Sequence, residues 1–414
     1  MSIWSKADLK TLVYQYESLS SEDQNDLKNF LNTSFPPKIV EKQLLMQREA
    51  INNNIKNRQI LSSTTQYYPE CIRSENVRGQ SKDLSEYAII LTAGGDGERL
   101  RTSLNKMGIP NDQLLDFTKA TYPLPHFGNK YGTLSVNLSL ISNLCRDNSI
   151  DIPVVITTGP QGSTTAKVIP IIVCKNNNFN IRNLKIIQQD LRIHFSQKGQ
   201  IVPTYKNYKS RPVTNPDETG GPIMKLKSPL PGTSESTLDW LSKLGCKKII
   251  LLQATALYDP QIIITMATAG KKYDGLGIGI RRASFPASDP YGTYVVLEKN
   301  NKKKLVIIES EIRNSRTRSL KNEDGTYYLP YNTGFYVFDI TIIRENSLPD
   351  YATPPKEIIP GIEKSPKIGY AATDIISFAK NPAVLTIPKK SFCVLKKYED
   401  LEKLAEIGER YSLF

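Results

Sequence analysis

The feature that most constrains the fold is a series of short, continuously apolar segments that recurs from residue 87 onward. Each has the length of a single strand, and helical stretches such as 234–245, which starts on a serine and ends on Gly245, separate them. Buried strands that alternate with helices are typical of a parallel sheet with helices on both faces. The sequence therefore predicts an α/β fold with a doubly wound, mostly parallel sheet, with strands at 87–93, 153–159, 184–190, 247–254 and 275–282.

The flanking parts of the chain have different patterns. Apolar residues between 9 and 16 lie at helical spacing, and Ser20 to Asp23 resembles a cap before a second helix. Pro36-Pro37 is expected to end that helix, and a polar stretch then leads to the first strand. We predict an N-terminal helical segment (1–85), a catalytic domain (86–345) and a C-terminal extension (346–414).

Antiparallel strands are expected near the end of the catalytic domain, in GTYVVLEK, KKLVIIESE and YNTGFYVFDI. The basic run Lys302-Lys303-Lys304 lies between two of them. We expect it to form a solvated hairpin turn.

The composition narrows the class of protein. No apolar run reaches the roughly 18 residues that a membrane-spanning helix needs, and the start MSIWSKADLK lacks a secretory pattern. The 5 scattered cysteines are expected to be free thiols in the cytoplasm. The formal net charge of +13 indicates an anionic partner. Because the basic residues form no arm or arginine-rich helix, a nucleoside triphosphate explains the charge as well as nucleic acid does.

A glycine-rich loop follows the first strand, in YAIILTAGGDGERL (87–100). It is no P-loop, and Leu100 occupies the third glycine position of a dinucleotide fingerprint. A tight turn would use the same glycines. However, open α/β sheets bind ligands at the carboxyl ends of their strands, and glycine N–H groups beside Arg99 can hold phosphate oxygens. A polyphosphate site is the preferred interpretation.

These residues resemble the signature of the nucleotide-sugar pyrophosphorylases, which have a GT-A-like nucleotidyltransferase fold. In that family the first strand leads into a G-G-x-G-[TS]-R loop, and a lysine follows downstream. Glu98 stands where the family has a small hydroxyl residue. Lys106 and Lys119 are both candidates for the lysine, and Lys119 is preferred because a tyrosine, a short strand and an amphipathic helix follow it. The loop residues matched are Ala93, Gly94, Gly95, Gly97 and Arg99.

Further stretches match the family in the expected order between residues 80 and 401. The resemblance implies that Gln188 and Gln189 face a uracil base and that a loop containing Gly220 and Gly221 packs against it. It implies sugar contacts for a glutamate at the end of a strand and for an N-[TS]-G turn, here Glu309, Asn332 and Gly334. Lys396 occupies the position of a lysine that reaches the phosphates.

The resemblance also implies the chemistry. A sugar 1-phosphate attacks the α-phosphorus of a nucleoside triphosphate, with UTP preferred and other nucleotides open, and pyrophosphate leaves. Such a transfer needs alignment and charge compensation but no protein nucleophile, and no nucleic-acid or membrane partner is expected.

The expected cofactor is Mg²⁺, which the family holds with an aspartate at the end of a strand. Here Gln253, Ala254 and Thr255 occupy that position, so Asp374 is the remaining candidate ligand, and Ala254→Asp is expected to restore activity in part. Because of these departures, a catalytically weakened relative that binds a nucleotide sugar as a sensor is the alternative hypothesis.

Overall fold

A computed structural model describes residues 3–95, 97–110, 114, 117–206, 208–286, 288–359, 361 and 364–408. The chain forms two compact units, and each is assembled from separate stretches of sequence. Unit 1 comprises Met1–Ser63, Asp190–Gly221 and Leu348–Ala372, and unit 2 comprises Thr64–Gln189, Pro222–Ser347 and Thr373–Phe414. The division of the chain at residues 85 and 345 stays a prediction.

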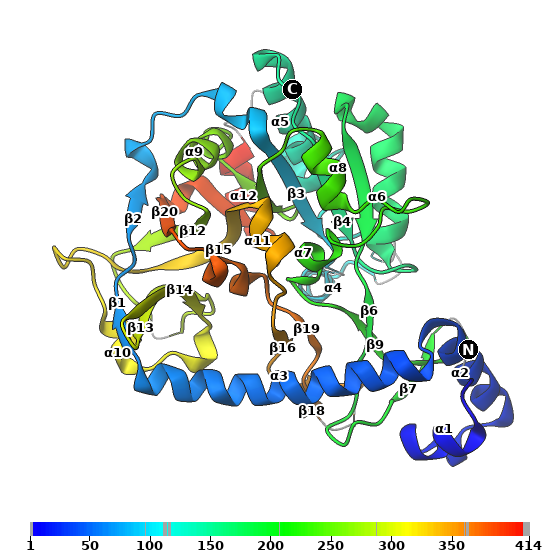
Figure 1. Ribbon diagram of the computed structural model, residues 1–414. Helices are drawn as coiled ribbons and strands as arrows, with labels where there is room; N and C mark the ends of the chain where they lie inside the picture. The colour runs from blue at the N-terminus through cyan, green and yellow to red at the C-terminus, as the bar shows by residue number, and fades with distance from the viewer. Residues whose placement is uncertain are drawn as a thin grey trace. The chain divides into compact units, whose positions relative to one another are not determined.

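Unit 2 contains an 11-stranded sheet with the order β2-β20-β12-β15-β10-β3-β4-β5, to which β1, β13 and β14 are attached (Figure 1). Neighbours along this path pair in parallel except at β15, which is antiparallel to both β10 and β12. The predicted mostly parallel α/β sheet is confirmed. Its strands are β1 (Thr65–Tyr67), β2 (Cys71–Arg73), β3 (Tyr87–Ala93), β4 (Val154–Thr158), β5 (Leu184–Gln188), β10 (Lys248–Gln253), β12 (Gly275–Arg282), β13 (Thr293–Lys299), β14 (Lys302–Ile308), β15 (Tyr328–Asp339) and β20 (Pro382–Ile387).

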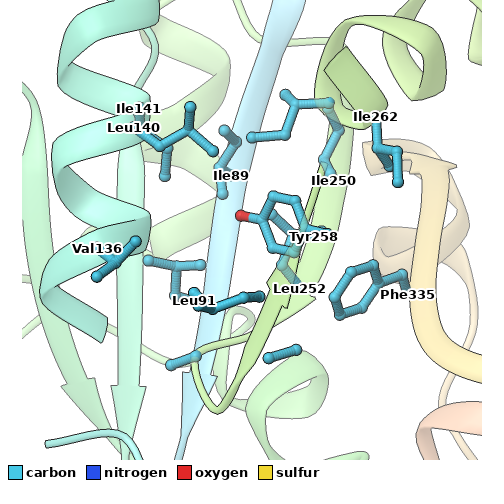
Figure 2. Close-up of a cluster of buried hydrophobic side chains, with 14 of the residues drawn as sticks. Ile89, Leu91, Val136, Leu140, Ile141, Ile250, Leu252, Tyr258, Ile262 and Phe335 are labelled. Carbon is cyan, nitrogen blue, oxygen red and sulfur yellow. The ribbon is translucent and has the colours of Figure 1, made fainter. Parts of the chain in front are cut away.

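The central strands are apolar throughout because both of their faces are covered. Ile89 and Leu91 of β3 belong to one hydrophobic cluster, and Ile90, between them, is fully buried on the opposite face. Figure 2 shows Val136 and Leu140 of helix α5 (Thr133–Asn148) beside these β3 side chains. Alternation within the strand therefore fills a core on each side of the sheet.

The parallel pairing places several strand ends at one edge of the sheet. Ala93 of β3 lies beside Thr158 of β4, and Thr158 lies beside Gln188 of β5. On the other side of β3, Thr92 is paired with Gln253, the last residue of β10. The loops that follow these residues are consequently neighbours, as expected of ligand-binding loops in open α/β sheets.

The hairpin of β13 and β14 corrects one prediction. The turn is made by Asn300 and Asn301, which adopt φ values of 52° and 59°. Asparagine tolerates this left-handed conformation better than lysine does. The three lysines at 302–304 are therefore the exposed start of β14 and do not form the turn.

Unit 1 contains helices α1 (Lys6–Leu12), α2 (Ser21–Ser34) and α3 (Pro37–Ser63), the last being the long blue helix of Figure 1. The expected cap is confirmed, since the Ser20 side chain accepts a hydrogen bond from the Asp23 N–H. The expected end of α2 before Pro36-Pro37 is confirmed, since this helix stops at Ser34, and the polar stretch that follows forms α3. Pro37 is the first residue of α3, a position where proline needs no N–H donor and has a suitable φ.

The remaining elements are short. Helices α4 (Glu98–Lys106), α6 (Thr164–Lys175), α8 (Thr237–Lys243), α9 (Gln261–Gly270), α10 (Ser315–Ser319), α11 (Ile340–Glu345) and α12 (Asp400–Gly408) belong to unit 2, and α7 (Gly221–Lys225) begins on the last residue of a unit 1 stretch. Two-stranded sheets join β6 (Leu191–Ile193) to β9 (Thr214–Pro216), β7 (Pro203–Lys206) to β8 (Lys209–Pro212), β11 (Ala256–Tyr258) to β21 (Phe392–Val394), β16 (Asp350–Ala352) to β19 (Ile368–Tyr370) and β17 (Lys356–Glu357) to β18 (Lys364–Ser365). Among the described residues, no helix is long and apolar enough to cross a membrane.

Candidate functional site

The glycine loop after β3 leaves room for side chains from elsewhere in unit 2. A Cβ atom at Gly95 would lie 3.8 Å from Nζ of Lys119, and one at Gly97 would lie 3.2 Å from Cγ of the same lysine. Gly97 has a φ of 79° and precedes the first turn of α4, so glycine is required there for conformation as well as for space. Lys119 therefore lies against the loop, as its preferred assignment requires.

Three cations share this part of unit 2. Burial lowers the pKa of Lys119, and the charges of Arg99 and Lys396 lower it further. The pKa of Lys396 is likewise lowered by burial and by Arg99. Because like charges disfavour one another in a partly buried place, this group is suited to an anion.

Arg99 and Lys106 lie at opposite ends of α4. Arg99 is in the first turn, and Lys106 is the last residue of the helix and is exposed. Seven residues of helix separate the two by roughly 10 Å. The structure thus brings Lys119, and not Lys106, against the glycine loop; the side chain of Glu98 and the whole of Asp96 lie outside what is described.

The paired glutamines end β5 at the same edge of the sheet. Gln188 is exposed, whereas Gln189 is buried and donates its N–H to the Thr158 carbonyl at 3.1 Å. The Gln189 amide oxygen lies only 1.9 Å from where a Cβ of Gly94 would be. One amide is thus open for recognition, and the other packs against the glycine loop beside Ala93.

The second glycine loop, residues 215–221, belongs to unit 1. The Gly220 N–H donates to the Tyr370 carbonyl at 2.7 Å, and the Tyr370 N–H donates to the Asp217 carbonyl at 3.0 Å. A Cβ at Gly220 would lie 2.8 Å from Tyr370, and one at Gly221 would lie 1.7 Å from Oδ1 of Asp217. These glycines let the loop lie flat against β19.

The predicted sugar-binding residues Glu309 and Asn332 meet at Gly292: its carbonyl accepts from the Asn332 N–H at 2.8 Å, and a Cβ atom on it would lie 3.2 Å from Oε2 of Glu309. The pKa of Glu309 is raised to about 7 by burial and by the carboxylates of Glu311 and Asp374. Burial also raises the pKa of Asp374 to about 6. Gly334 has a φ of 79°, and its N–H donates to Oδ1 of Asn332 at 2.9 Å. Asp374, the predicted metal ligand, is therefore a neighbour of Glu309.

The end of β10 has no ligands suited to a resident Mg²⁺ ion. The Gln253 amide nitrogen donates to the Thr333 carbonyl at 2.9 Å. The carbonyls that follow are engaged as well: that of Ala254 accepts from Thr133, that of Thr255 from the Leu395 N–H, and that of Ala256 from Asn137. Within the described residues, no group of three or more His, Cys, Asp and Glu could hold a metal ion. The end of β10 therefore does not supply the carboxylate that the expected magnesium site would need.

The burial of Ala254, directly after β10, argues against the expected effect of Ala254→Asp. Ala254 is fully buried within the main hydrophobic cluster of unit 2. A carboxylate at this position would be placed among apolar side chains, where an isolated charge is very unfavourable. Gln253, by contrast, is partly exposed.

Several residues near the candidate site were not predicted. Lys396 lies 4.4 Å from the ring centroid of Tyr291, and Tyr291 stacks on Tyr331 at 4.7 Å. Arg282 and Arg313 both donate to the buried carboxylate of Asp289. The only sequence signal for this group is a pair of arginines separated from an aspartate by aromatic residues, which is too general to indicate a site.

Comparisons with known proteins identify the fold. The UDP-N-acetylglucosamine pyrophosphorylase of Trypanosoma brucei, solved with an inhibitor, matches with a TM-score of 0.69 at 13% identity over 97% of this chain and 82% of that chain. A UDP-glucose phosphorylase of Trypanosoma brucei matches with a TM-score of 0.58 at 15% identity, over 88% and 77% of the two chains. A variant of Leishmania major UDP-glucose pyrophosphorylase, in complex with UDP-glucose, matches with a TM-score of 0.57 at 14% identity, over 93% of this chain and 79% of that chain. No protein-family model and no curated protein matches the sequence. The chain has the fold of these proteins.

Proposed function

We propose that this protein is a member of the nucleotide-sugar pyrophosphorylase family, a uridylyltransferase that makes a UDP-sugar and pyrophosphate from UTP and a sugar 1-phosphate. The observation that carries the proposal is the convergence of Arg99, Lys119 and Lys396 beside a glycine loop at the carboxyl end of β3. Solved structures with this fold, one of them holding UDP-glucose, support the same reaction class.

The proposed mechanism assigns one task to each group. The glycine loop and the three cations hold the triphosphate and oppose the charge that grows on the departing pyrophosphate. A phosphate oxygen of the sugar phosphate attacks the α-phosphorus in line, and the bond from that phosphorus to the pyrophosphate breaks. The attacking oxygen is already anionic near neutral pH, so alignment replaces a general base.

We propose that Mg²⁺ enters with the triphosphate as part of the substrate. Magnesium ions often keep several waters and bind mainly through substrate phosphates, with one or two protein carboxylates. Asp374 stays the proposed protein ligand for this ion. Its described electrostatic neighbours are the carboxyl group of Glu309 and the ammonium group of Lys304. The base assignment depends on Gln188 and Gln189, and a cytoplasmic location is supported by 5 free cysteines among the described residues.

The test is a pyrophosphate-release assay with UTP, ATP, GTP and CTP, each combined with a panel of sugar 1-phosphates. We expect release with UTP and at least one sugar phosphate. If these ligands raise the melting temperature but no pair releases pyrophosphate, the protein is a binding module and the proposal is wrong. Neither the described residues nor the comparisons favour that sensor hypothesis.

A further inference from the structure

The side-chain amide of Asn332 is almost completely used by its own protein. Its Oδ1 accepts hydrogen bonds from the Gly334 N–H at 2.9 Å and from the Tyr294 hydroxyl at 2.8 Å. The Ile278 carbonyl lies farther from the Tyr294 hydroxyl, at 3.3 Å, so the single hydroxyl hydrogen is directed mainly to Oδ1. Its Nδ2 donates to the Tyr336 hydroxyl at 2.8 Å. Because a backbone N–H can only donate, Gly334 fixes which end of the amide is the oxygen. Both acceptor positions of that oxygen are occupied, and one Nδ2 hydrogen is left.

The two tyrosines are held firmly in the sheet. Tyr294 of β13 and Tyr336 of β15 are almost completely buried, and burial keeps both of their pKa values far above the physiological range. A Cβ at Gly277 would lie 2.3 Å from the Tyr294 ring, and one at Gly279 would lie 3.3 Å from it. Gly277 and Gly279 of β12 therefore form the slot that receives this ring.

The turn that carries Asn332 is fixed from the other side by Gln253. The Gln253 amide donates to the Thr333 carbonyl, and its Nε2 lies 2.1 Å from where a Cβ of Gly334 would be. The Thr333 hydroxyl donates to the Ile278 carbonyl at 2.8 Å. Rotation of the turn would break these bonds, so the amide cannot turn over without leaving buried polar groups unpaired.

We propose that Asn332 presents only a hydrogen-bond donor to the sugar phosphate, and that Tyr294 and Tyr336 are positioning residues that set this polarity. Asn332 is only partly buried, so part of its surface is open to a ligand, and Nδ2 is the side-chain atom with hydrogen-bonding capacity left. This inference rests on the proposed function and specifies its substrate class. The sugar carries an accepting oxygen at this point, either a hydroxyl or an acyl carbonyl, and a sugar with a protonated amine there is rejected.

The test compares glucose 1-phosphate with its deoxy and deoxyfluoro analogues at each ring position. Fluorine keeps a weak acceptor but cannot donate, whereas hydrogen does neither. We expect one position at which the fluoro analogue retains kcat/KM about tenfold better than the deoxy analogue, the size of effect that one polar contact gives. Equal losses at every position would overturn the proposal.

Variants test the two positioning residues. Asn332→Asp removes the donor at nearly constant shape, and we expect it to abolish the advantage of fluorine and lower kcat/KM for the sugar phosphate about a hundredfold, with UTP affinity unchanged. Tyr294→Phe frees an acceptor position on Oδ1, and the ratio between the deoxyfluoro and deoxy analogues should shrink. Tyr336→Phe frees the second N–H and should raise KM more than it lowers kcat. Unchanged ratios in all three variants would overturn the proposal.

A matched control and a second readout complete the design. Tyr87→Phe also removes a buried hydroxyl, which donates to the Ala267 carbonyl at 2.7 Å, and it should leave the ratio unchanged. Calorimetric titration of the same analogues into the full chain reads binding without turnover. Binding with the expected polarity but no pyrophosphate release supports the inference and overturns the proposed function, and no binding at all overturns both.

Discussion

The surroundings of Lys119 disfavour its protonated, charged form unless an anion is bound. Its pKa is lowered by burial, by Arg99 and by Lys396, and the γ-, β- or α-phosphate of a nucleotide would reverse that effect. We predict that Lys119→Ala lowers kcat/KM about 30- to 1000-fold, which corresponds to about 2–4 kcal/mol of transition-state stabilisation. Lys106→Ala, at the exposed end of α4, is the matched control and should be nearly silent. Steady-state kinetics of both variants test this prediction. A larger loss of kcat/KM in Lys106→Ala than in Lys119→Ala would refute the placement of the phosphate lysine.

Glu309 gives a prediction in pH. Its folded pKa is about 7, against about 4.3 for an unfolded glutamate. Between these values the unfolded chain releases the proton and the folded side chain keeps it, so this group lowers the free energy of unfolding as pH rises, and its full penalty applies above pH 7. We predict that Glu309→Gln raises the melting temperature at pH 8 but not at pH 4, and that the free energy of unfolding at pH 8 rises by at most about 4 kcal/mol.

Calorimetric melts of both proteins across this pH range test the prediction. Glu311, Asp374, Arg313 and Thr373 face the same carboxyl group, and Glu311→Gln should give a smaller change of the same sign. A gain at pH 4 equal to that at pH 8 would mean that packing, and not charge, explains the effect.

For individual residues, the sequence predicted which side chains lie together better than it predicted the hydrogen bonds that fix them. The placement of Lys119 against the glycines, and of Glu309 near the Asn332 turn, followed from motif order. The buried contacts of Tyr294 and Tyr336 could not be predicted, because they join different strands and depend on the register of the sheet. The roles of these site residues stay predictions.

Among the secondary-structure elements, the end of β10 differs most from the sequence-based expectation. Alternation along the strand directs Ala254 into the core and leaves Gln253 partly exposed. We predict that Ala254→Asp destabilises the protein by several kcal/mol, because a carboxylate is buried without a partner. Gln253→Asp should fold and bring a carboxylate to the edge of the sheet, at the cost of the bond to Thr333.

Urea unfolding of the two variants and the Mg²⁺ dependence of their activity are the measurements. We expect Gln253→Asp to lower the Mg²⁺ concentration needed for half-maximal activity. Gln253→Asn, which adds no charge, controls for the lost contact. Equal stability of Ala254→Asp and the parent protein would contradict the burial argument.

The position of the loop at 215–221 depends on the absence of a side chain at Gly369 in β19. A Cβ at Gly369 would lie 2.4 Å from the Asp217 carbonyl oxygen, a backbone atom that cannot move independently. We predict that Gly369→Ala displaces the loop, raises the KM for the nucleotide more than that for the sugar phosphate, and costs about 1–3 kcal/mol of stability. Gly232→Ala, where no atom lies within 4 Å but φ is 76°, controls for the general cost of replacing a glycine.

Helix α3 shows why some elements could not be predicted. Its buried stripe at helical spacing consists of Val40, Gln43, Met46, Gln47 and Ala50, and two of these residues are polar. The Gln43 Oε1 accepts from the Ile193 N–H at 2.9 Å, and the Gln47 amide donates to the Ser196 carbonyl at 3.2 Å. Buried glutamines interrupt the apolar pattern by which a helix is recognised in a sequence, because they are buried through tertiary hydrogen bonds. The strands of the sheet are predicted more easily because their buried residues are apolar.

The positive charge of the whole molecule is distinct from the local charge of its site. We predict that UTP raises the melting temperature, since a ligand at 100 times its Kd stabilises the folded state by about 2.7 kcal/mol. The shift should disappear in Lys119→Ala but persist when the exposed hairpin lysines Lys299 and Lys302 are both replaced by alanine. Thermal melts with and without UTP at two salt concentrations test this. A shift that follows net charge and not Lys119 would indicate non-specific binding.

The assembly of unit 1 from three separate stretches has a consequence for how the protein is made. Met46 and Ala50 of α3 pack against Ala352 and Ile368, which leave the ribosome roughly 300 residues later. At about 5–20 residues per second, α3 waits roughly 15–60 s for these partners. During synthesis we therefore expect the N-terminal helices to be bound by chaperones, and stalled or truncated nascent chains to be targets for proteolysis.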